Sequence, residues 1–199
     1  ALSQLGPTPY LQTSDSPWAA SVGSSTFYLE NFEDGALNTP GVTASAGSPI
    51  GPASNVDSVD GDDGNINGSG TAGRSFFTSA GNTGIRFTFS SGTYGALPTH
   101  AGLVWTDGAG TIRFEAFDGN GASLGVINGN HADGGFNGTT AEDRFYGWVN
   151  PGGIGSIRIS NTSGGLEVDH LQYGAVPEPA TMTVLGLGLA SLVARRRRK

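Results

Sequence analysis

Hydrophobic and polar side chains alternate along several short segments of the chain. In residues 85–89, Ile, Phe and Phe are separated by Arg and Thr, and residues 112–116 repeat this pattern. A period of two buries one face of a β-strand and leaves the other in water. Strand-like segments of this kind recur along the sequence, at 26–32, 85–89, 102–105, 111–117, 124–127, 145–149, 154–159 and 166–173. The pattern predicts an all-β sandwich of about eight strands.

The segments between these strands are rich in turn-forming residues. The chain has 34 glycines among 199 residues, and pairs such as Asp107-Gly108 and Asn120-Gly121 tolerate the positive φ of tight turns. A chain of this length has room for one hydrophobic core but not comfortably for two.

The C-terminal end differs sharply from the body of the chain. Residues 180–194 carry no charge, and a basic block follows directly: Arg195, Arg196, Arg197, Arg198 and Lys199. As a helix this segment would be roughly 22 Å long, somewhat short of the ~30 Å hydrocarbon core of a membrane. We expect a single membrane-spanning helix with a basic cytoplasmic tail, because adjacent arginines argue against the alternative of a buried core helix.

A proline-flanked glutamate, Pro177-Glu178-Pro179, stands immediately before the apolar segment. The two prolines favour an extended segment that an enzyme cleft can receive, although an ordinary linker would have the same composition. The order of these parts over 176–199 resembles the PEP-CTERM sorting signal of bacteria that make extracellular polysaccharide. The resemblance implies recognition of Pro177, Glu178 and Pro179 by an exosortase, and removal of the apolar segment and basic tail. It also implies an inner-membrane precursor and a final location at the cell surface or in the extracellular matrix.

The charge of the chain is divided unevenly. Through Gly174 there are sixteen acidic residues and only five arginines. Such an acidic body repels phosphates, so nucleic acid is excluded as a partner. The absence of cysteine excludes disulfides, thiolate metal sites and a thiol nucleophile.

The two ends of the predicted sandwich resemble the first and last strands of calcium-bearing jelly-roll modules. The segments are FYLENFEDG, from Phe27, and LEVDHLQYG, ending at Gly174. The resemblance implies a jelly-roll-like sandwich whose terminal strands lie side by side. It further implies one Ca²⁺ shared by Glu33, Asp34 and Asp169.

A second oxygen-rich segment lies at 56–70. Asp63, Asn65 and Asn67 are spaced by two and followed by Gly68, which matches the first half of a calcium loop. Arg74 stands where the twelfth-position acid of an EF-hand would be, so a complete EF-hand is excluded. The alternative is a solvated, turn-rich loop.

No catalytic set emerges from the sequence. The carboxylates Glu115, Glu142, Glu167 and Asp169 are available, but their spacing singles out no glycosidase pair. The three histidines are scattered, and no GxSxG motif occurs. Trp105 and Trp148 are candidate glycan contacts at the rim of the sandwich, but the apolar residues beside them in the same strands favour core packing.

We therefore expect a flexible N-terminal segment (1–25), a sandwich ectodomain (26–174), a motif linker (175–179), a membrane helix (180–194) and a basic tail (195–199). The predicted function is a noncatalytic, calcium-stabilised protein of the cell surface or extracellular matrix. A carbohydrate-binding module for exopolysaccharide is the alternative, and a glycan-active enzyme is a weaker one.

Overall fold

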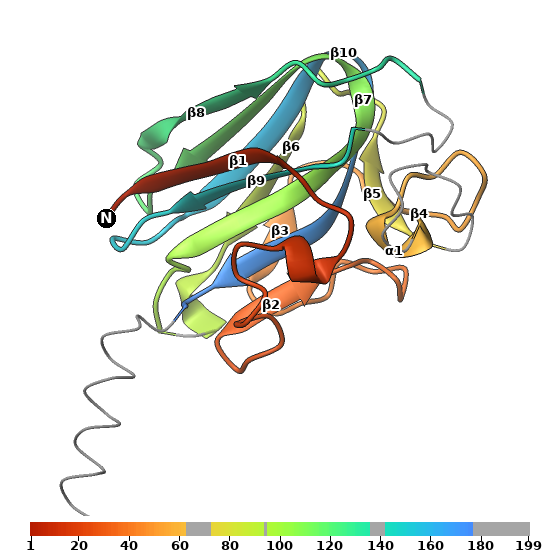
Figure 1. Ribbon diagram of the computed structural model, residues 1–199. Coiled ribbons are helices and arrows are strands. Elements are labelled where there is room, and N and C mark those ends of the chain that lie inside the picture. The colour runs from red at the N-terminus through yellow and green to blue at the C-terminus, as the bar shows by residue number, and fades with distance from the viewer. Residues whose placement is uncertain (63–72, 94, 136–141, 177–199) are drawn as a thin grey trace, which may run out of the picture.

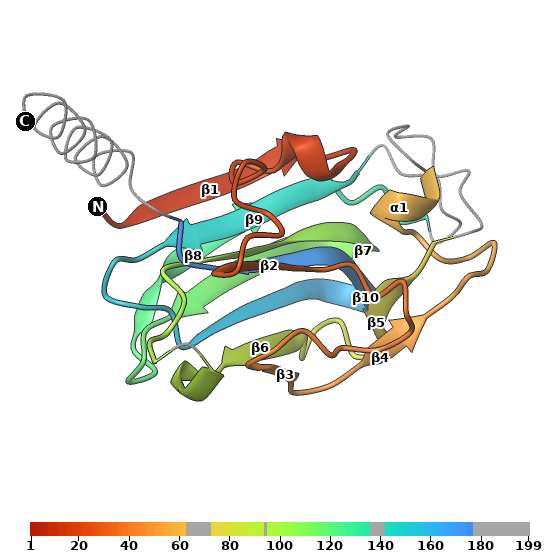
Figure 2. The same cartoon turned by 90° about the horizontal axis from the view of Figure 1, so that it is seen from below.

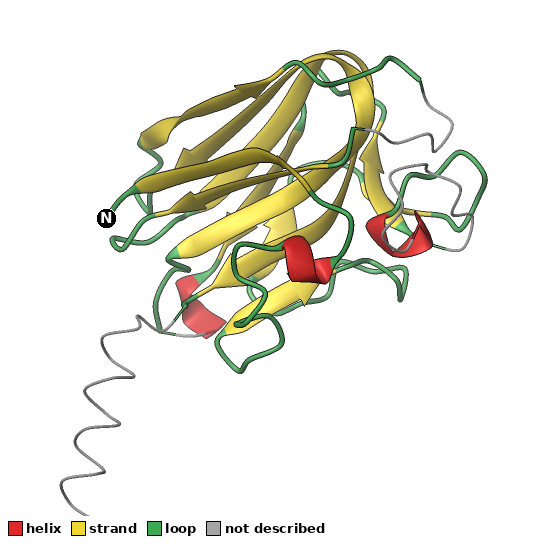
Figure 3. Ribbon diagram, in the orientation of Figure 1, coloured by secondary structure: helices red, strands yellow, loops and turns green. Residues whose placement is uncertain are grey.

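The computed structural model describes residues 1–62, 73–93, 95–135 and 142–176. Strands dominate these residues, and only short helical turns interrupt them (Figure 3). The strands are β1 (Ser3–Pro9), β2 (Phe27–Glu30), β3 (Val42–Ala44), β4 (Ser48–Ile50), β5 (Ser75–Thr78), β6 (Ile85–Phe89), β7 (His100–Phe117), β8 (Ser123–Gly129), β9 (Arg144–Val149) and β10 (Ser156–Gly174). The helical turns are η1 (Thr13–Asp15), α1 (Val59–Asp62) and η2 (Ser91–Thr93). The all-β prediction is confirmed.

The fold is organised around a long antiparallel ribbon formed by β7 and β10. The first half of β7 pairs with β9, which in turn pairs with β1, and the second half pairs with β8. Along β10, the outer partners are β6, then β5, then β2. The ribbon bends strongly and takes part in both layers of the fold (Figures 1 and 2).

The bend corrects one detail of the sequence prediction, which divided each long strand in two. Register shifts in the ribbon lie between Asn161 and Ser163 and between Ser163 and Leu166. Extra residues of this kind bend a strand without ending it. The Asp107-Gly108 pair, expected to form a turn, therefore lies inside β7 at the bend.

The main core lies between the two layers. Ile85, Phe87 and Phe89 are buried and Thr88 is exposed, as their alternation predicted. Phe114 of one layer lies 5.8 Å from Tyr146 of the other, measured between ring centroids. Aromatic burial of this kind is the main favourable term that holds such layers together.

The N-terminal segment belongs to the folded domain, contrary to the expectation of a flexible 1–25. β1 pairs with β9, and Tyr10 and Trp18 are buried in a second, smaller core. The Trp18 ring packs edge-on against Phe145 at 5.3 Å. The outer face of β9 and β7 is apolar at Phe145 and Val104, and the N-terminal segment shields these residues from water.

The first and last strands of the predicted sandwich lie side by side, as the jelly-roll resemblance implied: β2 pairs with the end of β10. Just beyond β10, the Ala175 N–H donates to the Thr26 carbonyl at 2.9 Å. The sorting motif at 177–179, the apolar segment and the basic tail lie outside the described residues. Within the described part of the chain, no helix is long and apolar enough to cross a membrane.

Candidate functional site

A pocket of about 670 Å³ opens at the bend of the β7–β10 ribbon. Its walls come from the segment after β4, from β5, from the bends of β7 and β10, and from the loop after β8. The described lining residues are Ile50, Gly51, Ala53, Asn55, Val56, Phe77, Asp107, Gly108, Ala109, Gly134, Gly135, Gly164, Gly165, Leu166 and Glu167.

Three pocket residues form a row across neighbouring strands. Phe77 of β5 is paired with Glu167 of β10, and Glu167 is paired with Asp107 of β7. Directly opposed residues of antiparallel strands project from the same face of a sheet. The row therefore places one aromatic ring and two carboxylates side by side in the pocket wall.

The two carboxylates differ in how they are satisfied. Glu167 accepts hydrogen bonds from the Asp57 N–H, at 2.7 Å, and from the Ser75 hydroxyl. Asp107 is only 9% exposed, and its Oδ1 has no hydrogen-bond partner among the described residues. Because a buried unpaired polar atom is costly, Asp107 Oδ1 stands out as an unsatisfied acceptor of a residue that lines the pocket.

Burial disfavours the charged form of these groups. It raises the pKa of Asp107 to about 6, with a smaller contribution from Asp133. It raises the pKa of Glu167 to about 7, and the Asp107 charge adds to this shift. Behind them, burial raises the pKa of Glu142 to about 8, helped by Asp133 and Asp107. Opposed like charges destabilise a sheet, so a positive charge placed here would be stabilising.

A neutral histidine backs the pocket. Burial lowers the pKa of His131 to about 4, and the nearby Arg144 charge lowers it further. The His131 Nε2 lies 2.7 Å from the Tyr146 hydroxyl, and the ring packs edge-on against Trp105 at 5.0 Å. His131 therefore contributes no positive charge near pH 7.

Phe77 supplies the pocket with a half-buried aromatic surface. Gly165 of β10 lies against its ring, and a Cβ at this position would come within 2.7 Å of the ring carbon Cε2. Glycine is thus required beside Phe77.

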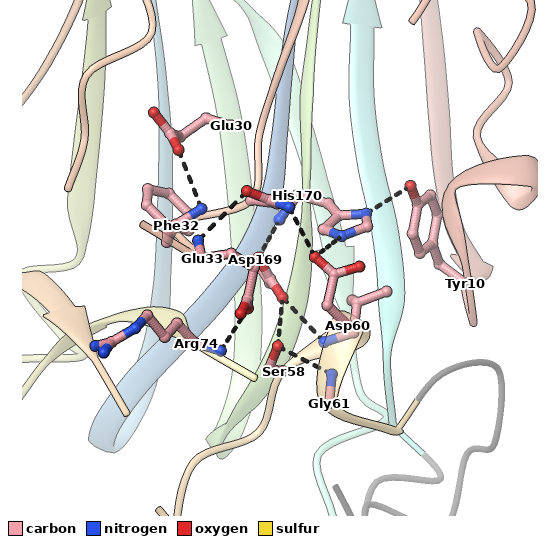
Figure 4. Close-up of polar contacts among 12 residues, drawn as sticks. Tyr10, Glu30, Phe32, Glu33, Ser58, Asp60, Gly61, Arg74, Asp169 and His170 are labelled. Carbon is pink, nitrogen blue, oxygen red and sulfur yellow. Dashed lines mark hydrogen bonds and ion pairs between the residues drawn. The ribbon is translucent and has the colours of Figure 1, made fainter. Parts of the chain in front are cut away.

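The predicted calcium residues Glu33, Asp34 and Asp169 do not converge on one point. Glu33 and Asp169 appear in Figure 4, where each faces hydrogen-bond donors of the protein. Asp169 Oδ2 accepts from the Val59 N–H at 2.9 Å and the Ser58 hydroxyl at 3.2 Å, and Glu33 accepts from the Arg74 N–H at 2.6 Å.

Asp34, in contrast, is exposed and bonds within its own turn, to Ala36 and Asn38. The set therefore does not fit a shared Ca²⁺, and the described residues hold no group of three or more acidic or histidine side chains able to bind a metal ion. The second predicted set, Asp63, Asn65 and Asn67, lies outside the described residues.

Of the two interpretations of Trp105 and Trp148, core packing is confirmed and glycan contact is wrong. Trp105 is fully buried and Trp148 is 1% exposed, because both indoles point into the main core. Neither ring offers a face to a sugar.

A polar network next to Asp169 links distant parts of the chain. His170 is buried with its Nε2 3.2 Å from Asp60 Oδ2 and its Nδ1 3.0 Å from the Tyr10 hydroxyl (Figure 4). Burial acts to raise the pKa of Asp60, but the contacts from His170 and Asn31 hold it below its usual value. His170 has a φ of 43°, an uncommon conformation for a bulky residue, at a register shift of β10.

Sequence reasoning missed the Asp107–Glu167 pair. Glu142 and Glu167 were recognised as available carboxylates, whereas Asp107 was assigned to a turn. Only the register of β7 against β10 brings together two residues that are sixty positions apart.

The comparisons identify the C-terminal signal. Residues 175–198 match the PEP-CTERM protein-sorting motif, so the chain carries the signal of an exported protein that is handled through the membrane. No curated protein matches the chain.

Solved structures show a distant likeness. A Streptococcus pneumoniae fucose binding module matches with 16% identity over 72% of this chain and 95% of that chain, at a TM-score of 0.35. The enzymatically active domain of bacteriophage CBA120 tailspike protein 4 matches with 15% identity over 73% of this chain, at a TM-score of 0.37. This chain spans only 20% of the tailspike chain. At these values the likeness assigns no ligand and no activity.

Proposed function

We propose that the chain is a noncatalytic exported protein of the cell surface or extracellular matrix whose folded domain binds glycan in the pocket at the ribbon bend. Its delivery depends on the PEP-CTERM motif, through which an exosortase acts at Pro177, Glu178 and Pro179. Processing there separates the domain from the apolar segment 180–194 and the basic tail 195–199.

The position of the pocket supports this arrangement. The folded domain leads directly into the motif, because β10 ends at Gly174 and the matched residues begin at 175. Leu166, in the pocket wall, precedes Gly174 by eight residues of strand, or about 26 Å. The pocket therefore lies away from the end of β10 that leads into the matched motif.

The observation that carries the glycan proposal is the row of Phe77, Glu167 and Asp107. Sugars stack an apolar face on an aromatic ring, and their hydroxyls donate to carboxylates. The pocket volume lies within the usual range for small-molecule sites, roughly 300–1,000 Å³.

The same row supports a noncatalytic role. Glycosidases place two carboxylates on either side of the scissile bond. Asp107 and Glu167 are neighbours on one ribbon, so both approach a ligand from the same side. This arrangement suits holding a sugar better than cleaving it.

A glycan array tests the binding proposal with the full chain, with and without calcium. We expect wild type to bind and Phe77→Ala to lose binding by at least about 10-fold, the order expected for one stacking contact. Asp118→Asn, at the far end of β7, should bind as wild type does. Folded wild-type protein that binds no glycan would overturn the proposal, and turnover of a bound glycan would replace the noncatalytic role with an enzymatic one.

A mass measurement tests the delivery proposal independently. We expect protein recovered from the envelope or medium of its own bacterium to end near residues 177–179. A chain recovered only at full length would contradict processing.

A further inference from the structure

We infer that the pocket selects sugars that carry a free ammonium group, that is, amino sugars without an N-acetyl substituent. The inference rests on the proposed glycan binding at this site and names the class of sugar. It comes from the charges that face the pocket and from one buried oxygen atom that lacks a partner.

The charged side chains in the described pocket lining are Asp107 and Glu167, and no lysine, arginine or histidine accompanies them there. Asp133 lies close enough to disfavour further negative charge, because it interacts electrostatically with Asp107. The site therefore opposes uronic acids and sulfated or phosphorylated sugars, and it attracts cations.

The nearest arginines bind other groups. Arg74 donates through its guanidinium to the Gly51 carbonyl. Arg144 donates to the Asp143 carbonyl at 2.8 Å. Neither arginine is among the lining residues, and the acidic pair is left without a cationic partner in the pocket wall.

Asp107 provides the specific contact. Its Oδ1 is buried and unpartnered among the described residues, and Asp107 is paired across the ribbon with Glu167, with which it interacts electrostatically. An ammonium group has three donors and no acceptor, so it can bond to both carboxylates at once. Such charge-assisted bonds are about twice as strong as neutral ones. An N-acetyl group has a single N–H donor and no charge, and it adds bulk.

An organic cation fits the site better than a metal ion. Ca²⁺ requires six to eight oxygens, roughly 2.3–2.6 Å away. The described residues contain no group of three or more side chains able to hold a metal. A pocket of about 670 Å³ is also far larger than an ion needs, whereas it admits a sugar ring beside Phe77.

Calorimetric titration of the full chain tests the inference with a matched pair of ligands. These are the β-1,4-linked disaccharide of glucosamine and its N-acetylated counterpart, compared at pH 6.5 and physiological salt. We expect the free amine to bind at least about 10-fold more tightly, as one charge-assisted pair in a buried site provides. Asp107→Asn should abolish this preference. Asp118→Asn removes the same charge at the far end of β7 and should retain it, which excludes non-specific attraction to an acidic protein.

The ratio of the wild-type affinities for the two disaccharides tests the amino-sugar inference even if a variant fails to fold. Equal affinity for the two disaccharides, or tighter binding of the acetylated form, overturns the amino-sugar inference and leaves glycan binding intact. Binding of neither disaccharide overturns the inference, and the glycan array then decides separately whether the pocket binds sugar at all. A preference that survives in a folded Asp107→Asn variant overturns the assignment of the contact to this pocket.

Discussion

The Tyr10 hydroxyl lies 3.0 Å from Nδ1 of His170, although 160 positions separate the two residues. Gln172 also donates to this hydroxyl, at 3.1 Å, and Ser16 donates to Gln172 at 2.5 Å. The N-terminal segment is thus fastened to the last strand by buried polar contacts as well as by Trp18. These contacts make the first 25 residues a structural part of the domain.

Replacing Tyr10 by Phe should destabilise the fold. The change removes the hydroxyl that contacts His170 Nδ1 and Gln172 Nε2, and leaving these buried atoms unpaired costs about 1–3 kcal/mol in the free energy of unfolding. Urea denaturation of the two proteins measures this difference. Tyr28→Phe is the control, because the Tyr28 hydroxyl bonds at an exposed position, to the Ser25 carbonyl. Equal stability of wild type and Tyr10→Phe would show that the network adds nothing.

Substitutions at Trp105 and Phe77 should affect the stability of the fold and its affinity for glycan to different extents. Trp105→Ala empties a fully buried site in the core and should cost about 3–5 kcal/mol. Phe77 is half-buried, so Phe77→Ala should cost less stability and more glycan affinity. Thermal unfolding and the glycan array, compared for both variants, check the two expectations. Loss of affinity in a folded Trp105 variant with intact binding in Phe77→Ala would reverse the assignment.

Stability should fall as pH rises from 7 to 8. Burial raises the pKa of Glu142 in the folded state from its ordinary 4.5 to about 8, so the folded state retains a proton that the unfolded state has lost. A carboxyl group whose pKa is raised on folding makes its full contribution to the free energy of unfolding at pH values below its unfolded-state pKa. This contribution declines as the pH rises to the folded-state pKa. Asp107 and Glu167, with values of about 6 and 7, act mainly at lower pH.

The decrease in the free energy of unfolding between pH 7 and 8 should depend on Glu142 itself. Each pKa unit corresponds to about 1.4 kcal/mol, so the loss across this window should be measurable by denaturation at several pH values. Glu142→Gln keeps the acceptor for the Asp133 N–H and removes the titrating proton, and it should flatten the curve. The other charges near this group, Asp107, Asp133 and Arg144, remain in that variant. An unchanged slope would place the titration elsewhere.

Calcium stabilisation stays a prediction for the segment with Asp63, Asn65 and Asn67. If it binds there, millimolar calcium should raise the melting temperature, because a ligand of the folded state shifts unfolding by mass action. Asp63→Ala should remove this effect and Asp34→Ala should not. A melting temperature that is independent of calcium and of EDTA would end the calcium hypothesis.

The alternation of apolar and polar residues predicted the strands that have one buried face and one exposed face. β6 is an example, since Ile85, Phe87 and Phe89 all point into the core. β3, β4 and β5 were missed because three or four residues are too few to show a period of two. β1 was missed because its side chains are largely exposed and it contains two prolines.

The site was less accessible to sequence reasoning than the fold. The C-terminal motif is contiguous, so its residues could be read directly and the match at 175–198 confirms them. The acidic pocket depends on pairing between Asp107, Glu167 and Phe77, which come from three strands. Trp105 was easier, because the apolar run Leu103-Val104 before it favoured core packing over a rim position, and the residue is fully buried.

Hydrogen exchange of the full chain, with and without the tightest glycan from the array, locates the binding site. We expect slower exchange in 50–56, 107–109 and 164–167, which surround the pocket, and no change around Thr26 and Thr99 at the opposite end of β10. Protection confined to that opposite end, with the pocket segments unchanged, would contradict the claim that the ribbon bend is the binding site.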